Sequence, residues 1–315
     1  MNCTDLFSYI HSLGLTEAGI APPILPLPKP AYAASPLCPL AAGSGAERYE
    51  PQRLLPSCQS ILVILFPYYI NGVEKSNISR YCRSLDYHLI VRDYLGRIEA
   101  FLHAYEECET KCIIDTSPLD DRWLAYEAGL GFFGDNHCLI NHRYGSYCFI
   151  GSILTSLPLP PHKPLAEECC HCGRCATACP GRCFQDGIYD YRRCKSFLTQ
   201  KKGSLLLPEI EVMQKTKLIF GCDVCQDVCP HNAHINATPL PEFQQNRLLC
   251  LQEKDIEGLS NRQFQQAYGD RAFAWRGKKQ LLRNLSYLQS RNPGYDGDGN
   301  IDEKEDNTAC HDNNR

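Results

Sequence analysis

The first 160 residues alternate short apolar runs with segments of helical periodicity. Residues 60–68, 111–115 and 147–155 are rich in Ile, Leu, Val, Phe and Tyr, and short runs of this kind predict strands. The segment between the first two runs places apolar residues on one helix face, at Leu85, Leu89, Leu95, Ile98, Leu102 and Tyr105. The pattern predicts an α/β or α+β domain over residues 1–160, with helices flanking a sheet.

A turn between strand and helix is predicted from Asp115 to Asp121. Ser117 is a favoured helix N-cap, Pro118 suits the first helical position, and Gly129 is placed to end the helix. Asp115 follows an apolar strand, and ligands of α/β sheets collect at the carboxyl ends of strands. Asp115 is therefore a candidate acid, and a turn or capping aspartate is the structural alternative.

A proline-rich segment marks the end of this domain, because proline continues neither helix nor strand. Its prolines are Pro158, Pro160, Pro161 and Pro164. Cysteines dominate residues 161–240, and residues 241–292 show a polar helical pattern. Residues 293–315, rich in Gly, Asp and Asn, predict a disordered acidic tail. Part of this tail resembles a calcium-binding loop, but its first ligand position would be Gly294, so a solvated tail is favoured.

Length and composition narrow the class of protein. The chain has 315 residues, a net charge of −4 and 20 cysteines. Its first residues do not resemble an export signal, and the longest apolar run, residues 61–66, is too short to cross a membrane. Because the cysteines are bunched at metal-ligand spacing, they predict metal binding in a reducing compartment, and hence a cytoplasmic protein without a membrane segment.

Charge is unevenly distributed. Residues 296–315 hold seven acids and two bases, which leaves the rest of the chain at about +1. Residues 271–283 carry five bases and no acid. This stretch is a candidate phosphate-binding patch, together with Arg192, Arg193 and Lys195, and solvated surface charge is the alternative.

Two cysteine runs carry the strongest chemical signal. The first has the spacing C-x2-C-x2-C-x3-C-P, in which three thiolates bind one 4Fe-4S cluster and the fourth reaches a neighbouring cluster. It consists of Cys169, Cys172, Cys175 and Cys179, followed by Pro180. The second run consists of Cys222, Cys225 and Cys229, followed by Pro230. Ile219 occupies the position of its first cysteine, so the second run lacks one ligand.

Crossing the two runs predicts two ligand sets. The first cluster would be bound by Cys169, Cys172, Cys175 and Cys229. The second would be bound by Cys179, Cys222 and Cys225, with Cys194 as the best fourth ligand. Paired C-x2-C units also build zinc sites, but the two C-x3-C-P endings favour clusters. Cys170, Cys183 and Cys250 are interpreted as buried thiols rather than ligands. Two adjacent clusters would carry single electrons to another site.

Several further motifs, over residues 50–290, resemble the epoxyqueuosine reductase family of cobalamin-dependent iron–sulfur enzymes. The matching pieces are Leu54-Leu55-Pro56, Arg80-Tyr81, Asp86-Tyr87-His88, Asp115-Thr116 with Pro118, Ala128-Gly129-Leu130-Gly131, both cysteine runs, Arg193-Cys194, Arg276-Gly277 and Leu282-Arg283-Asn284. Together with the cysteine runs, the resemblance implies a cobalamin-binding domain at residues 1–160, a ferredoxin-like domain with two 4Fe-4S clusters at residues 161–240, and a short helical C-terminal extension. It implies a tRNA substrate recognised at its anticodon loop. It also implies an unidentified electron donor, and we expect a monomer.

The resemblance implies roles for single residues. Asp115 would donate a proton to the oxygen that leaves when reduced cobalamin attacks an epoxide carbon. Cys194 would ligate the second cluster. The residues implied at the cobalamin pocket are Arg80, Tyr81, Cys82, Asp86, Tyr87, His88, Gly131, Gly134 and Asn136. The resemblance further implies that no protein histidine ligates the cobalt.

The chain also departs from the family pattern. Asp135 stands where the family usually has lysine, His231 replaces the usual tryptophan, and the region before residue 50 is short and rich in proline. A cobalamin-dependent reductase of a small molecule is therefore one alternative function, and an iron–sulfur electron carrier is another. His88, His137 and His231 are candidate ligands or acids, although isolated histidines more often pack or face solvent.

Overall fold

The computed structural model describes residues 3–28, 34–72 and 74–289. Its centre is a four-stranded sheet in the order β1-β2-β6-β3, in which every neighbouring pair is antiparallel. The strands are β1 Ala18–Ala21, β2 Ser60–Pro67, β3 Thr110–Ile113 and β6 Cys148–Thr155. Three strands were predicted from the apolar runs, and the structure confirms them with shifted ends. The sequence left α/β and α+β open, and the antiparallel order makes the domain α+β.

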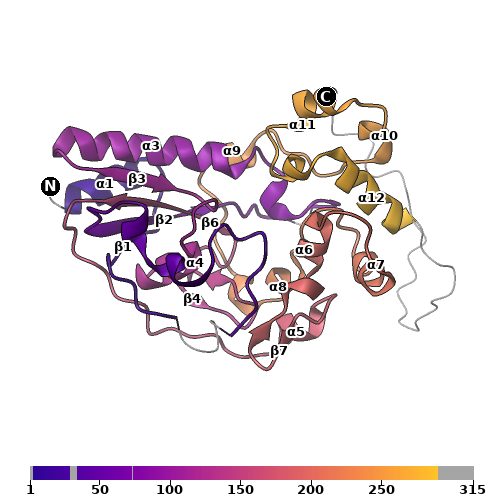
Figure 1. The fold of residues 1–315 in the computed structure, drawn as a ribbon, viewed down its shortest axis with the longest axis horizontal. Coiled ribbons are helices and arrows are strands. Elements are labelled where there is room, and N and C mark those ends of the chain that lie inside the picture. Colours follow the sequence, from indigo (N-terminus) through magenta and orange to yellow (C-terminus); the bar gives the residue numbers. More distant parts are fainter. Residues whose placement is uncertain (1–2, 29–33, 73, 290–315) are drawn as a thin grey trace.

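Helices cover both faces of this sheet, which explains why strand β2 is apolar throughout (Figure 1). Leu62, Ile64 and Phe66 pack in one cluster with helices α1 (Cys3–Ser12) and α3 (Tyr87–Tyr105). Ile61, Val63 and Leu65 point the other way and pack with α4 (Asp121–Glu127). Successive side chains of a strand face opposite sides, so a strand covered on both sides loses its polar positions.

The predicted helix before β3 is α3. For two of its residues, the prediction that they lie on the core-facing side is wrong. Leu89 and Tyr105 are about half exposed. The face that packs on the sheet contains Ile90, Val91, Tyr94, Leu95, Ile98 and Leu102. Gly151 of β6 lets this helix lie close, because a Cβ there would lie 2.7 Å from Val91 Cγ1.

The predicted turn after β3 exists, but the helix begins later than expected. Asp120 is the N-cap of α4 and accepts a hydrogen bond from the Trp123 amide at 3.3 Å, so the predicted cap at Ser117 and helical start at Pro118 are wrong. Gly129 ends the helix as predicted, with φ at 72° and its amide bonded to Tyr126 O.

The cysteine region and the extension contain short elements (Figure 1). Two small hairpins are β4–β5 (Phe132–Phe133, Leu139–Ile140) and β7–β8 (Phe184–Gln185, Ile188–Tyr189). The helices are α5 Arg174–Ala178, α6 Lys195–Gln200, α7 Leu207–Gln214, α8 Val224–Asp227, α9 Pro241–Gln244, α10 Glu253–Ile256, α11 Asn261–Tyr268 and α12 Lys278–Gln289. The 3-10 turns are Gly45–Tyr49, Pro51–Arg53, Arg80–Cys82, Tyr191–Arg193, Pro230–Asn232 and Ala272–Arg276. Residues 241–289 are thus helical, as the sequence predicted.

Hydrophobic clusters cross the predicted domain boundaries. Ile78 and Cys82 from the first 160 residues pack with Phe220, Leu251 and Phe264. Leu240 and Phe243 likewise join the cluster that contains α3. The predicted acidic tail lies outside the described residues. Among the described helices, none has both the length and the apolar character to cross a bilayer.

Candidate active site and cluster-binding cysteines

The four cysteines predicted for the first cluster surround one cavity. Cys169, Cys172, Cys175 and Cys229 all line it, together with Gly134 and Asn136 of the β4–β5 turn. No cysteine among the described residues forms a disulfide, so these thiols are available to metal. Cys175 is buried whereas Cys172 is exposed, so one side of this first cysteine group faces solvent. The crossed ligand set therefore fits a 4Fe-4S cluster.

The cysteines predicted for the second cluster form another group. Cys194 is the N-cap residue of α6, and its charge influences both Cys222 and Cys225. Cys179 joins the group through Cys183, whose thiol is hydrogen-bonded to those of Cys179 and Cys194. Sequence reasoning chose Cys194 to complete this set, and the fold brings it to the other three. This second cysteine group also fits a cluster.

Two further thiols border the second group: Cys183, which was interpreted from the sequence as a buried non-ligand, and Cys138, which was not singled out. Cys183 is 1% exposed, and its amide donates to Cys179 Sγ at 3.4 Å. The Cys138 thiol is hydrogen-bonded to that of Cys225. Cys138 lies far from both cysteine runs in the sequence, so spacing gave no signal for it. Cys170 and Cys250, also interpreted as non-ligands, are exposed and half-buried.

The surroundings of the thiols differ within the second group. The hydrogen bond from Cys183 lowers the pKa of Cys179 to about 6, with help from the amides of Cys183, Gly181 and Arg182. The pKa of Cys194 is also below its ordinary value, because Cys183 and Tyr189 donate hydrogen bonds to it. Burial instead raises the pKa of Cys222 to about 12. Two of the four thiolates are thus already stabilised by hydrogen bonds before metal binds.

Asp115 lies where β3 ends beside the beginning of β6. Because β3 and β6 are antiparallel, a cavity of about 270 Å³ at this edge is lined by Asp115 and by Cys148 and Phe149 of β6. Asp115 has φ at 50°, in the left-handed region that most residues avoid. Its side chain is 63% exposed. Asp115 is therefore a turn residue at the edge of a cavity and not a helix cap, so its catalytic role stays a prediction beside the alternative of a turn aspartate.

Two residues of α3 contact the Asp115 carboxylate. Tyr87 donates its hydroxyl to Oδ2 at 2.6 Å, and His88 Nε2 lies 3.6 Å from the same oxygen. His88 Nδ1 lies 2.8 Å from Asp86 Oδ1, and Asp86 is the N-cap of α3. The sequence motif Asp86-Tyr87-His88 and Asp115 thus form one connected group.

The electrostatics of this group favour an ionised Asp115. The imidazolium of His88, 3.6 Å away, holds the pKa of Asp115 below its usual range, and the hydrogen bond from Tyr87 adds to this effect. Burial lowers the pKa of His88, but pairing with Asp115 and Asp86 outweighs it and raises the pKa to about 9. Near neutral pH, a charged imidazolium therefore lies beside an aspartate anion.

Asp121 is a second carboxyl group at the same cavity that sequence reasoning did not single out as a site residue. Its Oδ2 accepts the Asp115 amide at 3.0 Å, and its buried Oδ1 has no partner within the described part of the chain. Burial, followed by the charges of Asp115 and Asp120, raises its pKa to about 8. One protonated and one ionised carboxyl group thus share this turn near neutral pH.

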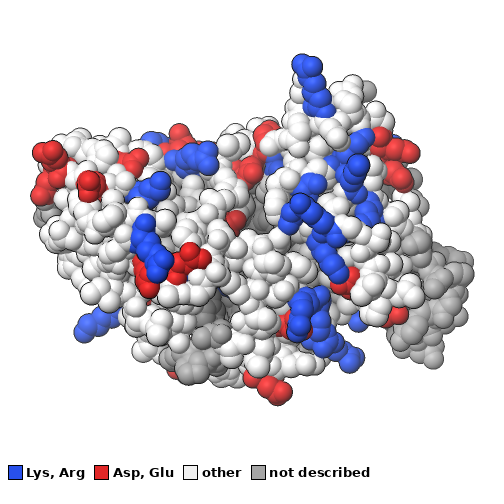
Figure 2. Space-filling view, viewed as in Figure 1, with Lys and Arg blue, Asp and Glu red and all other residues white. Residues whose placement is uncertain are grey.

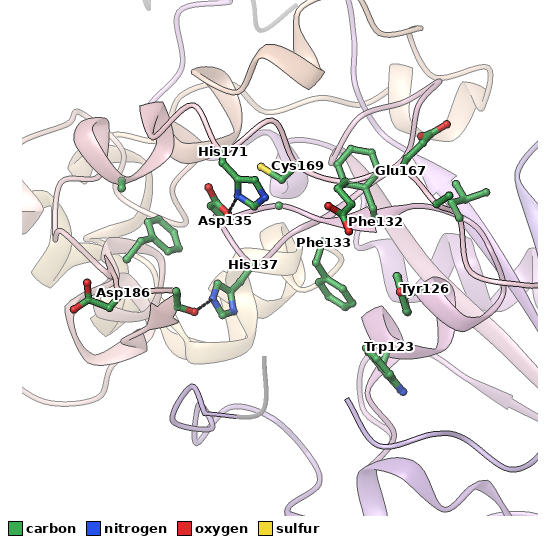
Figure 3. Close-up of a pocket in the computed structure, with 17 residues that line it drawn as sticks. Trp123, Tyr126, Phe132, Phe133, Asp135, His137, Glu167, Cys169, His171 and Asp186 are labelled. Atoms are coloured by element: carbon green, nitrogen blue, oxygen red, sulfur yellow. Dashed lines mark hydrogen bonds and ion pairs between the residues drawn. The ribbon is translucent and has the colours of Figure 1, made fainter. Parts of the chain in front are cut away.

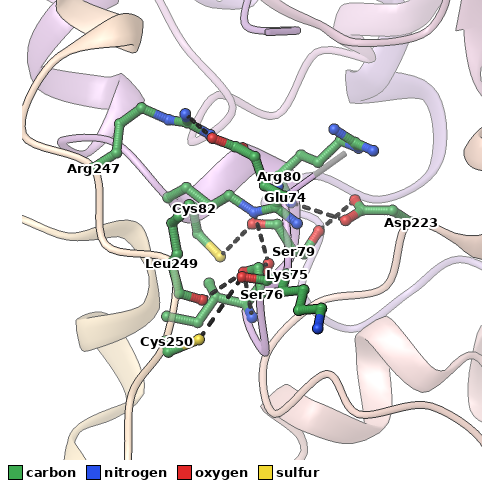
Figure 4. Close-up of polar contacts among 12 residues, drawn as sticks. Glu74, Lys75, Ser76, Ser79, Arg80, Cys82, Asp223, Arg247, Leu249 and Cys250 are labelled. Atoms are coloured by element: carbon green, nitrogen blue, oxygen red, sulfur yellow. Dashed lines mark hydrogen bonds and ion pairs between the residues drawn. The ribbon is translucent and has the colours of Figure 1, made fainter. Parts of the chain in front are cut away.

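Arg80, Tyr81 and Cys82 are three of the residues implied at the cobalamin pocket, and Figure 4 shows the polar contacts of Arg80 and Cys82. The Arg80 amide donates to Asp223 Oδ2 at 2.9 Å, and Asp223 stands between the ligands of the second run. Tyr81 packs against Phe220. Cys82 is fully buried, with its thiol 3.2 Å from Ser79 O. Their role towards cobalamin stays a prediction.

The implied residues Gly131, Gly134 and Asn136 belong to the β4–β5 hairpin beside the cysteines. A Cβ at Gly131 would lie 2.4 Å from Ile140 O, which explains the glycine as a close approach of two chains. Asn136 accepts from the Cys138 amide at 3.2 Å and donates to Cys225 O at 3.3 Å. These residues are placed to support the cluster-binding cysteines, and contact with cobalamin stays a prediction.

A cavity of about 740 Å³ lies beside the first cysteine group (Figure 3). Trp123, Tyr126, Phe132 and Phe133 form an aromatic wall on one side. The other side carries Cys169, His171, Asp135 and Asp186, and His171 Nδ1 lies 2.8 Å from Asp135 Oδ1. Asp135, the departure from the usual lysine, is thus paired with a histidine next to a predicted ligand.

Of the three candidate histidines, only His88 lies at the Asp115 cavity. Burial lowers the pKa of His137, and its Nε2 lies 3.2 Å from Gly187 O. His231 Nε2 accepts from the Cys170 amide at 3.4 Å, and its ring packs against Phe132. His137 and His231 therefore make structural contacts at the two cysteine groups.

The predicted phosphate patch is largely wrong. Lys195 is 1% exposed, and its ammonium donates to Met213 O and to Thr216. Arg283 donates to the carbonyls of residues 198, 201 and 203, and Arg271 donates to Asn246 O. These cations hold the chain together because their hydrogen bonds go to backbone carbonyls. Arg192, Arg193 and Lys279 remain exposed.

Comparisons with known proteins match the segment that contains Asp115 and the segment that contains both cysteine runs. Residues 48–116 match the family described as "Epoxyqueuosine reductase QueG, DUF1730". Residues 168–232 match the "4Fe-4S double cluster binding domain". Among curated proteins, the chain is 37% identical over 251 residues to an epoxyqueuosine reductase of Bacillus cereus, covering 76% of this chain and 65% of that protein. The corresponding enzyme of Lactococcus garvieae is 34% identical over 253 residues, covering 76% and 71%.

A solved structure shows similarity over a larger share of the chain. A crystal structure of epoxyqueuosine reductase with an epoxyqueuosine-modified tRNA-Tyr stem loop superposes with a TM-score of 0.81 at 28% identity. The superposition covers 91% of this chain and 80% of that one. The chain spans just under two thirds of the length of the Bacillus cereus relative.

Proposed function

Since this chain belongs to the epoxyqueuosine reductase family, we propose that it reduces epoxyqueuosine in tRNA to queuosine, using two 4Fe-4S clusters and cobalamin. One observation supports this reading above the others. Arg122 lines the Asp115 cavity and donates to His137 O at 2.6 Å, and the next residue, Cys138, is hydrogen-bonded to Cys225. A short run of chain therefore joins the candidate acid to the second cysteine group.

The clusters would deliver single electrons along one direction. The first cysteine group faces solvent at Cys172, so it is suited to accept electrons from a donor protein. The second group lies next to Cys138 and Arg122, and thus towards the Asp115 cavity. Electrons would enter at the first group and leave from the second.

Two neighbouring cavities offer space for cobalamin. The cavity at Asp115 measures about 270 Å³ and the aromatic cavity about 740 Å³. Sites for drug-sized ligands occupy roughly 300–1,000 Å³, and cobalamin is larger than such ligands. Arg122 lines the first cavity and His137 lines the second, so the hydrogen bond between them lies at the border of the two. Together the cavities offer both polar and aromatic walls for one large cofactor.

Asp115 would act on the oxygen of the substrate. Bound cobalamin, when reduced, supplies a strong nucleophile that opens an epoxide. The departing oxygen needs a proton, and Asp115 is placed at the cavity to provide it. Because His88 and Tyr87 favour the anion, Asp115 must gain a proton before it can act as an acid. Asp121, which keeps its proton near neutral pH, and the His88 imidazolium are the nearby sources.

The tRNA would lie on the face that carries exposed cations. Figure 2 shows Lys and Arg gathered over the part of the molecule that contains α6, α7 and α12. The Trp275 side chain is 55% exposed, and the guanidinium carbon of Arg276 lies 3.8 Å from the centroid of its ring. The indole Nε1 of Trp275 donates to Gln200 Oε1 at 3.2 Å. An aromatic ring fixed in this way is suited to stack on an unpaired base of an anticodon loop. We further propose a cytoplasmic monomer served by a separate electron donor.

The test uses protein reconstituted anaerobically with iron, sulfide and cobalamin, then supplied with a chemical reductant and epoxyqueuosine-containing tRNA. Mass spectrometry of the digested tRNA should show queuosine replacing epoxyqueuosine. Cobalamin and tRNA that both bind without conversion would contradict the proposed reaction. Cobalamin binding without tRNA binding would instead favour reduction of a small molecule, and absence of cobalamin binding would favour an electron carrier.

A further inference from the structure

Cys183 lies between two ligands of the second cluster without belonging to the predicted ligand set. Its thiol is hydrogen-bonded to those of both Cys179 and Cys194. Gly181 brings the chain in tightly, since a Cβ there would lie 1.8 Å from Arg193 O and 3.2 Å from Cys183 Sγ. The Cys183 side chain is 1% exposed, so the surrounding chain holds the sulfur in this position.

A second donor reaches the same ligand from the β7–β8 hairpin. The Tyr189 hydroxyl is hydrogen-bonded to the Cys194 thiol. The hairpin holds both donors, because Phe184 pairs with Tyr189 and the Asp190 amide donates to Cys183 O at 2.8 Å. One small element thus positions two hydrogen-bond donors beside one ligand sulfur.

A cubane binds four thiolates, and Cys179, Cys194, Cys222 and Cys225 already supply them. A thiol that lies against two of these ligands can donate its single proton to either of their sulfurs, one at a time. Reduction adds one electron to the cluster and breaks no bond, so the ligand sulfurs become more negative and accept hydrogen bonds more strongly. Donors to cluster sulfurs therefore stabilise the reduced form and raise the reduction potential.

We propose that Cys183 and Tyr189 are hydrogen-bond donors that raise the reduction potential of the second cluster, and that Cys183 is not one of its ligands. The inference rests on Cys179 and Cys194 being ligands, as the proposed function requires. It adds a tuning role that needs neither tRNA nor cobalamin to be measured. The expected consequence is that the second cluster draws electrons from the first.

The test compares Cys183→Ala and Tyr189→Phe with the Cys229→Ser protein that is their common parent. Both variants are made in a Cys229→Ser background, which removes a ligand of the first cluster so that the remaining signal belongs to the second. Iron and sulfide are counted after anaerobic reconstitution. The cluster is then titrated with dithionite and followed by electron paramagnetic resonance. Cys170→Ala, at an exposed thiol beside the first group, is the matched control.

We expect unchanged iron content and a midpoint potential that moves to more negative values in both variants, while the control does not move. Tyr189→Phe removes a single oxygen atom, so its result does not depend on how well the cysteine variant folds. Loss of iron from Cys183→Ala would show that Cys183 is a ligand and would overturn the proposal. An unchanged potential in both variants would overturn it as well.

Discussion

The two cysteine groups have similar sequence patterns but different surroundings. In the first group, Cys172 is exposed and Cys169 lines a large cavity. In the second, the Cys179 sulfur receives hydrogen bonds from the amides of residues 181–183 as well as from the Cys183 thiol. The Cys194 sulfur receives them from Tyr189, from Cys183 and from the amides of residues 196 and 197.

This difference assigns the groups different tasks. Solvent exposure gives a redox partner access, whereas hydrogen bonds to the sulfurs raise the reduction potential. The second group also has the buried Lys195 ammonium close enough to Cys222 for their charges to interact. Under the proposed function, an electron that enters at the first group would therefore move towards the second group, next to the candidate acid.

Removing one cluster at a time should give the largest effects, and it tests whether the two cysteine groups have different tasks. Cys222→Ser should lose half of the iron and all epoxide reduction, because the second group is the exit. Cys229→Ser should also lose half of the iron, yet keep part of the activity when a small chemical reductant replaces the protein donor. Iron counting and tRNA mass spectrometry measure both. Equal activity losses with the small reductant would contradict the assigned order.

Replacing Asp115 should have the next largest effect on epoxide reduction. Asp115→Asn keeps the shape but cannot donate the required proton, so we expect conversion to fall about 10²- to 10⁴-fold, which is the usual contribution of general acid catalysis. Single-turnover assays with the reduced holoenzyme measure the rate. Asp93→Asn, at a carboxylate that is 70% exposed on α3, is the control. Conversion within twofold of the unaltered protein would remove Asp115 from the mechanism.

Replacing the exposed Trp275 should cause a smaller change, in the affinity for tRNA. Trp275 is held by Gln200 of α6, the helix that begins after the ligand Cys194. Stacking on a base is worth about 1–3 kcal/mol, so Trp275→Ala should weaken the affinity for tRNA by that amount. Trp275→Phe should retain most of it. Filter binding at a fixed salt concentration measures the affinity, and equal affinities for all three proteins would exclude stacking.

The smallest effect concerns stability. The folded-state pKa of Asp121 is raised from 3.8 to about 8, so the folded chain binds this proton more tightly than the unfolded chain. The stabilisation linked to this proton is complete at low pH and is lost as the pH rises through about 8. Asp121→Asn should therefore unfold less readily than the unaltered protein at pH near 9, by about 1 kcal/mol or more, the equivalent of one pKa unit.

Denaturant unfolding at pH 5 and near pH 9 measures this difference. His88, whose pKa is raised to about 9, also loses its pairing energy as the pH rises, so some pH dependence should persist in the variant. Asp115, whose pKa is lowered, remains ionised over this range and keeps its charge in both proteins. An identical pH dependence for both proteins would show that Asp121 is ionised in the folded state.

Local sequence patterns determined much of this protein. Cysteine spacing predicted both ligand sets, and the four thiols of the first set line one cavity in the fold. Apolar runs predicted β2, β3 and β6, and β2 is apolar from Ile61 to Pro67 because both of its faces are covered. Gly129 was predicted to end α4 because few other residues adopt its conformation.

Only the tertiary structure decided which surroundings these residues share. Strand direction depends on pairing between distant segments, so the antiparallel sheet and the meeting of Asp115 with Phe149 had no local signal. Lys195 reads as a surface cation in the sequence, yet folding buries it among carbonyl groups. Cys138, Cys183 and Asp121 acquire their chemistry from neighbours that the chain brings together only when it folds, because hydrogen bonds and burial depend on distance in space.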